Sequence, residues 1–204
     1  MGRAAHCLGA AAFIVICSHI GRAVAAEPGH SVYTATRAKN CREIRNDQIS
    51  SDEACKGLGD LIVLRQIDDD RETISVGNSA KAAAAEPAAA QGFVQFNSTD
   101  NTVEWRSGAD DKPFAIIQRW HITDYEDLGA NDRPRSVAML VVTRLAPGPV
   151  CHVAYVDVAA NTNANALAQH AADDWARSFD CKKDTIHVGG QRGRAVDLAL
   201  PEKR

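Results

Sequence analysis

Alternating apolar and polar residues indicate several β-strands in the middle of the chain. Residues 71–77, RETISVG, place Ile74 and Val76 between polar neighbours, which is the two-residue period of a half-buried strand. The preceding run LIVLRQI, residues 61–67, has the composition of a second strand, and the aspartates at 68–70 are typical of a turn. We therefore expect these two strands to form a β-hairpin.

A second hairpin is expected where the runs TVEWR and FAIIQRW flank the turn SGADDK. Pairing Trp105 with Phe114 sets Val103 opposite Ile116, and all four side chains then share one face of the sheet. Trp120 extends this face. A shift by one residue would break the agreement, so the hydrophobic pattern indicates this register.

Two further strands and a helix are expected in the C-terminal half. SVAMLVVTRL, residues 136–145, is apolar on both faces, as in a central covered strand, and CHVAYVDV, residues 151–158, follows as the next strand. Residues 163–179 repeat apolar positions every three or four residues, which is the helical period. This helix would present a water-facing side made of Gln169, Asp173, Asp174 and Arg177.

The remaining segments carry weaker patterns. Residues 27–60 look irregular, apart from a short strand in SVYTAT. The alanine-rich residues 80–91 predict one or two helical turns interrupted by Pro87, or a mobile surface segment. The tail, residues 185–204, is expected to fray or to add a short strand.

These elements predict an α+β fold. We expect a single domain over residues 27–204, with a mostly antiparallel β-sheet, one long C-terminal helix (about residues 163–179) packed on it, and two disulfides.

The N-terminus has the order of regions typical of a secretory signal. Arg3 is followed by an apolar run at residues 7–17 and then by the small residues AVAA at 23–26. A membrane anchor is the alternative, but it needs roughly 20 apolar residues, and this run is about half as long. We expect residues 1–26 to be removed by cleavage after Ala26, or after Ala25, which leaves no membrane span and places the mature protein in the periplasm or outside the cell.

The charge balance argues against one class of partner. The chain carries a formal net charge of −3, and residues 1–26 hold two arginines and no acidic residue, so the mature part carries −5. Domains that bind nucleic acid are usually basic, so no nucleic-acid partner is expected.

Four cysteines remain after the signal: Cys41, Cys55, Cys151 and Cys181. An even number in an exported chain favours two disulfides over a zinc site, because no C-x-x-C and no H-x-x-x-H spacing is present. Of the three pairings, sequence proximity favours Cys41–Cys55 and Cys151–Cys181. A strand of about eight residues spans roughly 26 Å, and a helix of about 16 residues spans roughly 24 Å. A helix that runs back along its strand would therefore return Cys181 to Cys151.

The sequence carries no recognisable catalytic motif. G-x-S-x-G, S-x-x-K, G-x-G-x-x-G and a phosphate loop are all missing, so no catalytic residue, cofactor or metal is expected. The sheet face opposite Trp105 would carry Arg106, Arg119 and His121, and we take these three with His152 as a hypothetical ligand patch. The alternative is a solvated or helix-covered face whose charges are paired.

Four stretches of the chain resemble an uncharacterised family of small secreted, periplasmic bacterial proteins with no assigned activity. They are DRETISVG (70–77), VEWR (103–106), PFAIIQRW (113–120) and the run from CHVAYVDV to RSFDC (151–181). The resemblance implies export and a shared fold, and it supplies no substrate or site residue. The chain departs from the family at KGLGDLIVL, where a more aromatic, glycine-rich stretch is expected.

The function expected from these observations is non-enzymatic binding. The protein would be an exported envelope protein that recognises another envelope protein or a small ligand. The alternative is a periplasmic hydrolase or metal-dependent enzyme that uses His121, His152 or Asp157. A third hypothesis is a small-molecule or anion carrier built on Arg106 and Arg119.

Overall fold

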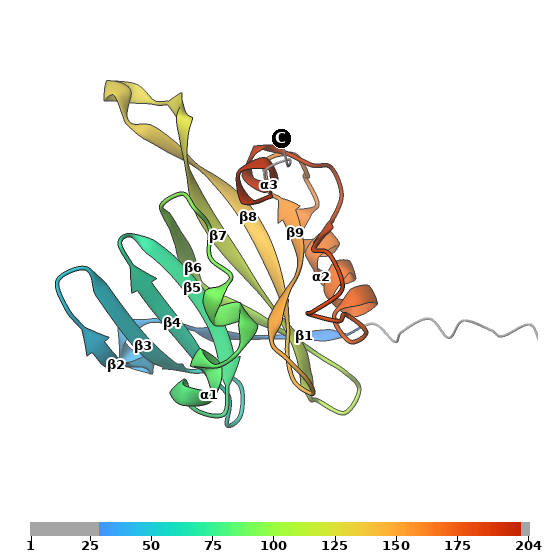
Figure 1. The fold of residues 1–204 in the computed structure, drawn as a ribbon. Helices are drawn as coiled ribbons and strands as arrows, with labels where there is room; N and C mark the ends of the chain where they lie inside the picture. Colours follow the sequence, from blue (N-terminus) through green and yellow to red (C-terminus); the bar gives the residue numbers. More distant parts are fainter. Residues whose placement is uncertain (1–28, 201–204) are drawn as a thin grey trace, which may run out of the picture.

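Strands dominate the computed structural model, which describes residues 29–200 (Figure 1). Strands contain 47% of these residues and helices 19%, so the fold is mostly β. The expected signal, residues 1–26, lies outside the described residues.

The larger sheet has six strands in the order β1-β6-β7-β8-β9-β10. All neighbours are antiparallel except β9 and β10, which run parallel. The strands are β1 (His30–Ala35), β6 (Asn97–Ser107), β7 (Pro113–Leu128), β8 (Pro134–Arg144), β9 (Cys151–Asp157) and β10 (His187–Val188).

The smaller sheet has four antiparallel strands in chain order. They are β2 (Cys41–Asn46), β3 (Ser50–Lys56), β4 (Ile62–Asp68) and β5 (Arg71–Gly77). The α-helices are α1 (Ala80–Ala84), α2 (Ala164–Trp175) and α3 (Arg194–Ala199), and the 3-10 turns are η1 (Ala38–Asn40), η2 (Pro87–Ala90) and η3 (Ala130–Asp132).

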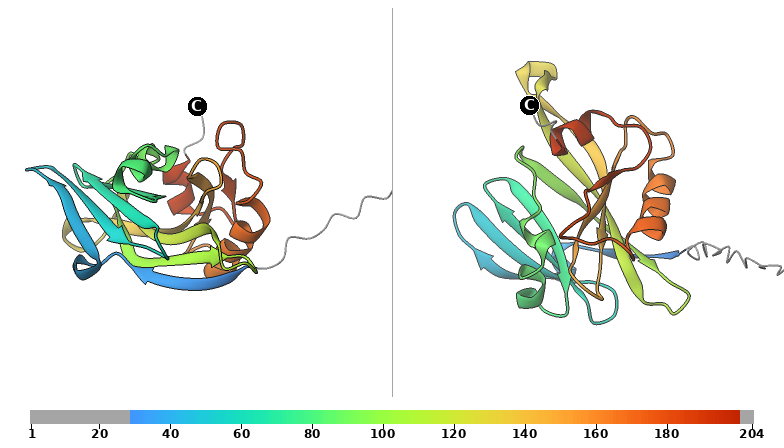
Figure 2. Two further views of the ribbon diagram at one scale, coloured as in Figure 1. Left: turned by 90° about the horizontal axis from the view of Figure 1, so that it is seen from below. Right: turned by 45° about the vertical axis from the view of Figure 1, so that its right-hand side comes forward.

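The elements form three layers, with the six-stranded sheet in the middle (Figures 1 and 2). One face packs on α2 through small side chains, such as Ala168 and Ala172. The other face packs on the smaller sheet, and the core between the sheets contains Trp105, Trp120 and Ile74. Because both faces of the central sheet are covered, its middle strand β8 is apolar on both sides, as its sequence predicts.

The hairpin of β4 and β5 is confirmed, with Ile62 opposite Gly77 and Asp68 opposite Arg71. Asp69 and Asp70 make the turn with φ angles of 47° and 57°. Two residues with positive φ match the right-handed twist of the flanking strands, and aspartate tolerates this conformation.

The register predicted for the second hairpin is wrong by two residues. Trp105 lies opposite Ile116, and Val103 lies opposite Gln118. A shift by two keeps the period of the strands, so Val103, Trp105 and Ile116 stay on their predicted face and the hydrophobic pattern does not distinguish the two registers. Phe114 alone changes side: the ladder is irregular at this end of β7, and Phe114 packs in the core under α2.

The short strand expected in SVYTAT is confirmed as β1, but the irregular structure predicted for the rest of the segment up to residue 60 is wrong, because it contains β2 and β3. Nearly every residue of β2 is exposed, so burial does not hold this edge strand. The ladder with β3, the disulfide between the paired residues Cys41 and Cys55, and the ion pair of Arg45 with Asp52 hold it instead. A hydrophobic pattern cannot report these interactions.

The α+β fold with a long C-terminal helix over residues 163–179 is contradicted. α2 covers only Ala164–Trp175, and a few residues later the amides of Ser178 and Phe179 both bond to the Trp175 carbonyl as the chain turns. Cys181, six residues beyond the end of α2, is bound to Cys151 at the start of β9. The apolar period outlasts the helix because Phe179 still packs in the same core.

Of the two outcomes expected for residues 185–204, the short strand is confirmed as β10 and the fraying is wrong as far as the described residues extend. The tail contains β10 and α3, and the ring of His187 lies 4.3 Å from that of Trp175. Arg194 donates two hydrogen bonds to Asp124 on β7, and this guanidinium lowers the pKa of the Asp124 carboxyl. The anchors of the tail are remote in sequence, so its own composition does not reveal them.

Both predicted disulfides are confirmed: Cys41–Cys55 and Cys151–Cys181. Two disulfides indicate that the protein folds in an oxidising environment. Within residues 29–200 no helix has the length and apolar character needed to cross a membrane.

Replacing Cys151 and Cys181 together by alanine should lower the free energy of unfolding by about 3–4 kcal/mol, because the bridge closes the longer loop. The sequence separation is 30 residues for this bridge and 14 for Cys41–Cys55. The Cys41/Cys55 double alanine variant should therefore lose slightly less, about 3 kcal/mol. Urea unfolding followed by tryptophan fluorescence measures both losses, and a larger loss for the Cys41/Cys55 variant would contradict the loop-length argument.

Candidate functional site

The four residues of the expected ligand patch do not come together, and Arg106 is withdrawn from the surface. Its Nε and Nη2 atoms donate to the two carboxylate oxygens of Asp173 on α2, at 3.1 and 2.6 Å. The two side chains are only 7% and 9% exposed. Arg106 also donates to the Gly29 carbonyl and the Ser31 hydroxyl. This guanidinium therefore links strand to helix and is not accessible to a ligand. Asp173, which was expected to face water, is its buried partner.

Arg119 and His121 do share one face of β7, where both approach Asp100 of β6. His121 Nε2 lies 2.9 Å from Asp100 Oδ1, and Arg119 Nε lies 3.7 Å from Oδ2. All three side chains are partly exposed. This part of the patch is therefore a partly exposed surface whose charges are paired, which is the alternative to a ligand patch that the sequence left open. In the described part of the chain no hydroxyl or thiol hydrogen-bonds His121, so the Asp–His pair has no nucleophile.

His152 lies on the opposite face of the sheet, in the core between the two sheets. It is 1% exposed, and Phe93, Trp120 and Tyr155 surround its ring. Its Nδ1 lies 2.8 Å from the Tyr155 hydroxyl. Burial lowers the pKa of His152 to about 3 and raises the pKa of Tyr155. His152 is therefore a neutral core residue and cannot reach a substrate in this conformation.

Asp157 is equally enclosed, at 1% exposed. One carboxylate oxygen accepts the amide of Ala160, and the other accepts the amide of Ala195 in the first turn of α3, both at 2.8 Å. The carboxylate thus satisfies amides that the helix itself leaves unpaired. Two of the three residues in the enzyme hypothesis, His152 and Asp157, have structural partners instead of access to solvent.

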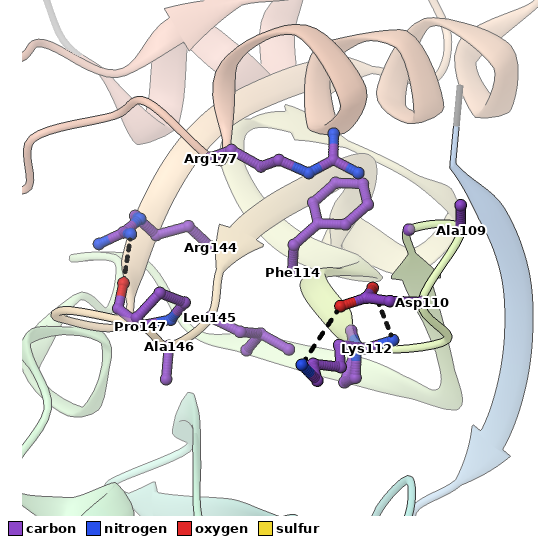
Figure 3. A pocket seen from close by; sticks show the side chains of 11 residues that line it. Ala109, Asp110, Lys112, Phe114, Arg144, Leu145, Ala146, Pro147 and Arg177 are labelled. Atoms are coloured by element: carbon purple, nitrogen blue, oxygen red, sulfur yellow. Dashed lines mark hydrogen bonds and ion pairs between the residues drawn. The ribbon is translucent and has the colours of Figure 1, made fainter. Parts of the chain in front are cut away.

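The candidate site is a pocket of about 610 Å³ at the end of the β6–β7 hairpin (Figure 3). Three segments remote in sequence line it: the hairpin turn, the end of β8 with the turn that follows, and the residue two positions beyond α2. Apolar side chains make up much of the lining, and cationic groups stand among them. The side chains that matter for its chemistry are Lys112, Phe114, Arg144, Leu145, Pro147 and Arg177.

The irregular end of β7 shapes this pocket. It turns Phe114 toward α2, and the Arg177 guanidinium lies over the Phe114 ring with its Cζ atom 3.5 Å from the ring centroid. A cation over an aromatic face is attracted by the quadrupole of the ring. The same contact keeps the long Arg177 side chain extended over one wall of the pocket (Figure 3).

Arg144 builds a second wall, beside the end of α2. Its Nε, Nη1 and Nη2 atoms donate to the carbonyl oxygens of Ala176, Pro149 and Pro147 at 3.1, 2.7 and 2.8 Å. These bonds tie the β8–β9 turn to the end of α2. Gly148 in this turn has a φ of +89°, and a side chain there would crowd the Arg144 guanidinium, so glycine suits the position. The wall is therefore rigid before any ligand arrives.

The pocket has an excess of positive charge. Within residues 29–200 neither Arg144 nor Arg177 forms an ion pair with a carboxylate, whereas Lys112 lies 3.4 Å from Asp110. Arg144 is only 7% exposed. Three cations and one carboxylate thus surround a largely apolar space.

No protein-family model, curated protein or solved structure matches this chain. The likeness to small secreted bacterial proteins stays a resemblance of four sequence stretches. The pocket is therefore interpreted from its own chemistry.

Sequence reasoning missed every important residue of this pocket. Arg177 was placed on the water-facing side of a helix, and Phe114 on the same face as Trp105. Arg144 offered the one available signal, because it is an arginine at the end of an otherwise apolar strand. Long cationic side chains rarely occur in such positions without a specific set of partners.

Proposed function

We propose that this is an exported, non-enzymatic binding protein of the bacterial envelope, active in the periplasm or outside the cell, which holds a small ligand in the pocket of Figure 3. The signal-like N-terminus, the two disulfides and the resemblance to small secreted proteins support export. A protein partner in the envelope is the other form of binding to be tested.

The pocket itself is the observation that carries this proposal. Its volume of about 610 Å³ lies in the range of small-molecule sites. The Arg144 hydrogen bonds hold one wall, and the Phe114 contact holds Arg177 on the other. A site that is ordered in advance loses little conformational entropy when a ligand binds.

The enzyme hypothesis has less support. His152 and Asp157 are each 1% exposed, and Asp100 is bonded to the one partly exposed candidate, His121. General acid–base catalysis requires a group within hydrogen-bond reach of the substrate. A binding role needs only the pocket.

The test is saturation-transfer NMR with five single compounds: benzyl alcohol, indole, benzoate, phenyl phosphate and benzylamine. At least one should bind with a dissociation constant of about 1 mM or tighter, which is a modest demand for a pocket of this size. Ala146→Trp should abolish the signal, because Ala146 lines the pocket and is exposed, so a large side chain fills the space without disturbing the core.

Ala85→Trp is the matched control, since Ala85 is an exposed alanine at the end of α1 and outside the pocket. It should leave the signal unchanged. Binding that survives Ala146→Trp would show that the pocket is not the site. Turnover of phenyl phosphate, detected as free phosphate, would replace the binding proposal with an enzymatic one.

A further inference from the structure

We infer that the pocket selects an amphiphilic anion: a small molecule with an apolar body and a carboxylate, sulfonate or phosphate group, which Arg177 binds at the rim. This inference rests on the proposed function, because it names the ligand class of the same pocket. It also differs from the anion carrier considered from the sequence, since Arg106 and Arg119 are paired with Asp173 and Asp100.

The Arg177 guanidinium is placed to donate hydrogen bonds. In the described part of the chain its one hydrogen bond runs from Nη1 to the Asp173 carbonyl at 3.5 Å, which is long for an N–H···O bond. Stacking over Phe114 uses the face of the planar group and leaves its edge for donors. The edge of a guanidinium matches the two oxygens of a carboxylate, sulfonate or phosphate.

Arg177 is exposed and lines the pocket beside the hairpin turn. Gly108 of the hairpin turn is the neighbouring residue, and a Cβ atom built there would lie 3.4 Å from Arg177 Nη2 and 3.2 Å from the Asp110 carboxylate. The hairpin turn therefore approaches Arg177 closely, and because Gly108 has no side chain, this residue does not crowd the guanidinium. Asp110 is paired with Lys112 and so does not neutralise Arg177.

Arg144 adds a charge that favours the same ligand. Its guanidinium is buried against three carbonyl oxygens, without a carboxylate partner in the described residues. The carbonyl dipoles stabilise the cation, but they do not cancel its charge. In a poorly solvated region the electrostatic interaction of this charge is weakened less by solvent than it would be in water. The field in the pocket thus attracts an anion and repels a cation.

The apolar lining sets the other half of the ligand. Leu145, Pro147 and the edge of Phe114 offer hydrocarbon surface beside the two guanidinium groups. A fully hydrated inorganic anion would leave this surface unused, whereas a neutral apolar molecule would leave the charges uncompensated. An amphiphilic anion satisfies both.

A pair of fluorescent probes tests this inference. Anilinonaphthalene sulfonate and N-phenyl-1-naphthylamine have the same aromatic body, and only the first carries a sulfonate. The wild-type protein should bind the sulfonate probe at least about tenfold more tightly, the factor expected of a charged hydrogen bond. Arg177→Met should remove most of this difference, with the remainder due to Arg144, and should leave the neutral probe unaffected. Arg177→Lys, which keeps the charge without the planar edge, should fall between.

Arg42→Met is the matched control, because it removes one exposed arginine from β2 in the other sheet. It should leave both affinities unchanged. Equal affinity for the two probes, with no effect of Arg177→Met, would overturn the inference about the anion and leave the pocket proposal standing. If Ala146→Trp leaves both probes bound, they bind elsewhere and the pocket proposal itself fails. If the sulfonate probe does not bind while indole or benzyl alcohol does, the ligand is not an anion.

Discussion

Replacing Asp173 by alanine is expected to lower the free energy of unfolding by about 3–5 kcal/mol, because the substitution leaves the buried Arg106 guanidinium without its counter-ion. The pair is bidentate, and both side chains are less than one-tenth exposed. Arg106→Ala should cost a similar amount. Arg106→Lys should recover only part of the loss, since an ammonium group cannot make the paired bonds of the guanidinium fork.

Urea unfolding provides the measurement, and the Arg45–Asp52 pair of the smaller sheet provides the control. That pair is also bidentate, but the Arg45 side chain is 47% exposed. Asp52→Ala should therefore cost much less than Asp173→Ala, because solvent screens an exposed pair. The double variant Arg106→Met with Asp173→Leu should be more stable than either single alanine variant, because no charge is then buried alone. A loss below about 1 kcal/mol for Asp173→Ala would mean that water reaches Arg106.

The free energy of unfolding is expected to fall as the pH is lowered below about 6.5, because His152 stays neutral in the folded protein. Its pKa is about 3 in the folded state and close to 6.5 in the unfolded chain. Between these values the unfolded state binds a proton that the folded state does not. The contribution of neutral His152 to stability is therefore fully present above about pH 6.5 and is lost as the pH falls toward 3. Linkage gives a loss of about 2 kcal/mol between pH 7 and pH 5 from this residue.

The comparison of variants isolates the contribution of His152. His152→Phe retains an aromatic ring among Phe93, Trp120 and Tyr155, and it should flatten the pH dependence between pH 7 and pH 5. His170, which is exposed on α2, serves as the control: His170→Gln should leave the slope unchanged. Equal slopes for the wild type and His152→Phe would show that His152 does not cause the pH dependence. Chemical unfolding curves at several pH values supply the slopes.

Local patterns were sufficient where an element depends on residues near it in the chain. The alternation in RETISVG and the aspartate turn predicted the β4–β5 hairpin, because period and turn chemistry act within a few residues. The apolar run of β8 predicted a covered strand. The disulfide pairing followed from proximity in the sequence, whereas the length argument for Cys151–Cys181 assumed a longer helix than α2.

The same patterns failed where distant partners decide the outcome. β2 is polar and exposed, yet a cross-strand disulfide and ion pairs hold it as a strand. The tail is ordered through Asp124 and Trp175, which belong to other elements. α2 ends at Trp175 although the apolar period continues, because Phe179 beyond the helix packs in the same core. These long-range contacts do not change the periodic pattern of hydrophobic residues in β2, α2 or the tail, so the pattern cannot reveal them.

By itself, the sequence determined several individual strands and the pairing of the four cysteines in two disulfides. It also determined on which face of the sheet most residues of the second hairpin lie. Only the tertiary structure decided that Arg106 is buried against Asp173 and that His152 is buried in the core between the two sheets. It also decided that Phe114, Arg144 and Arg177 line one pocket. Periodicity reports the face on which a side chain lies, whereas a site depends on which remote segments approach that face. That approach is set by the packing of α2 and the two sheets, which no local pattern contains.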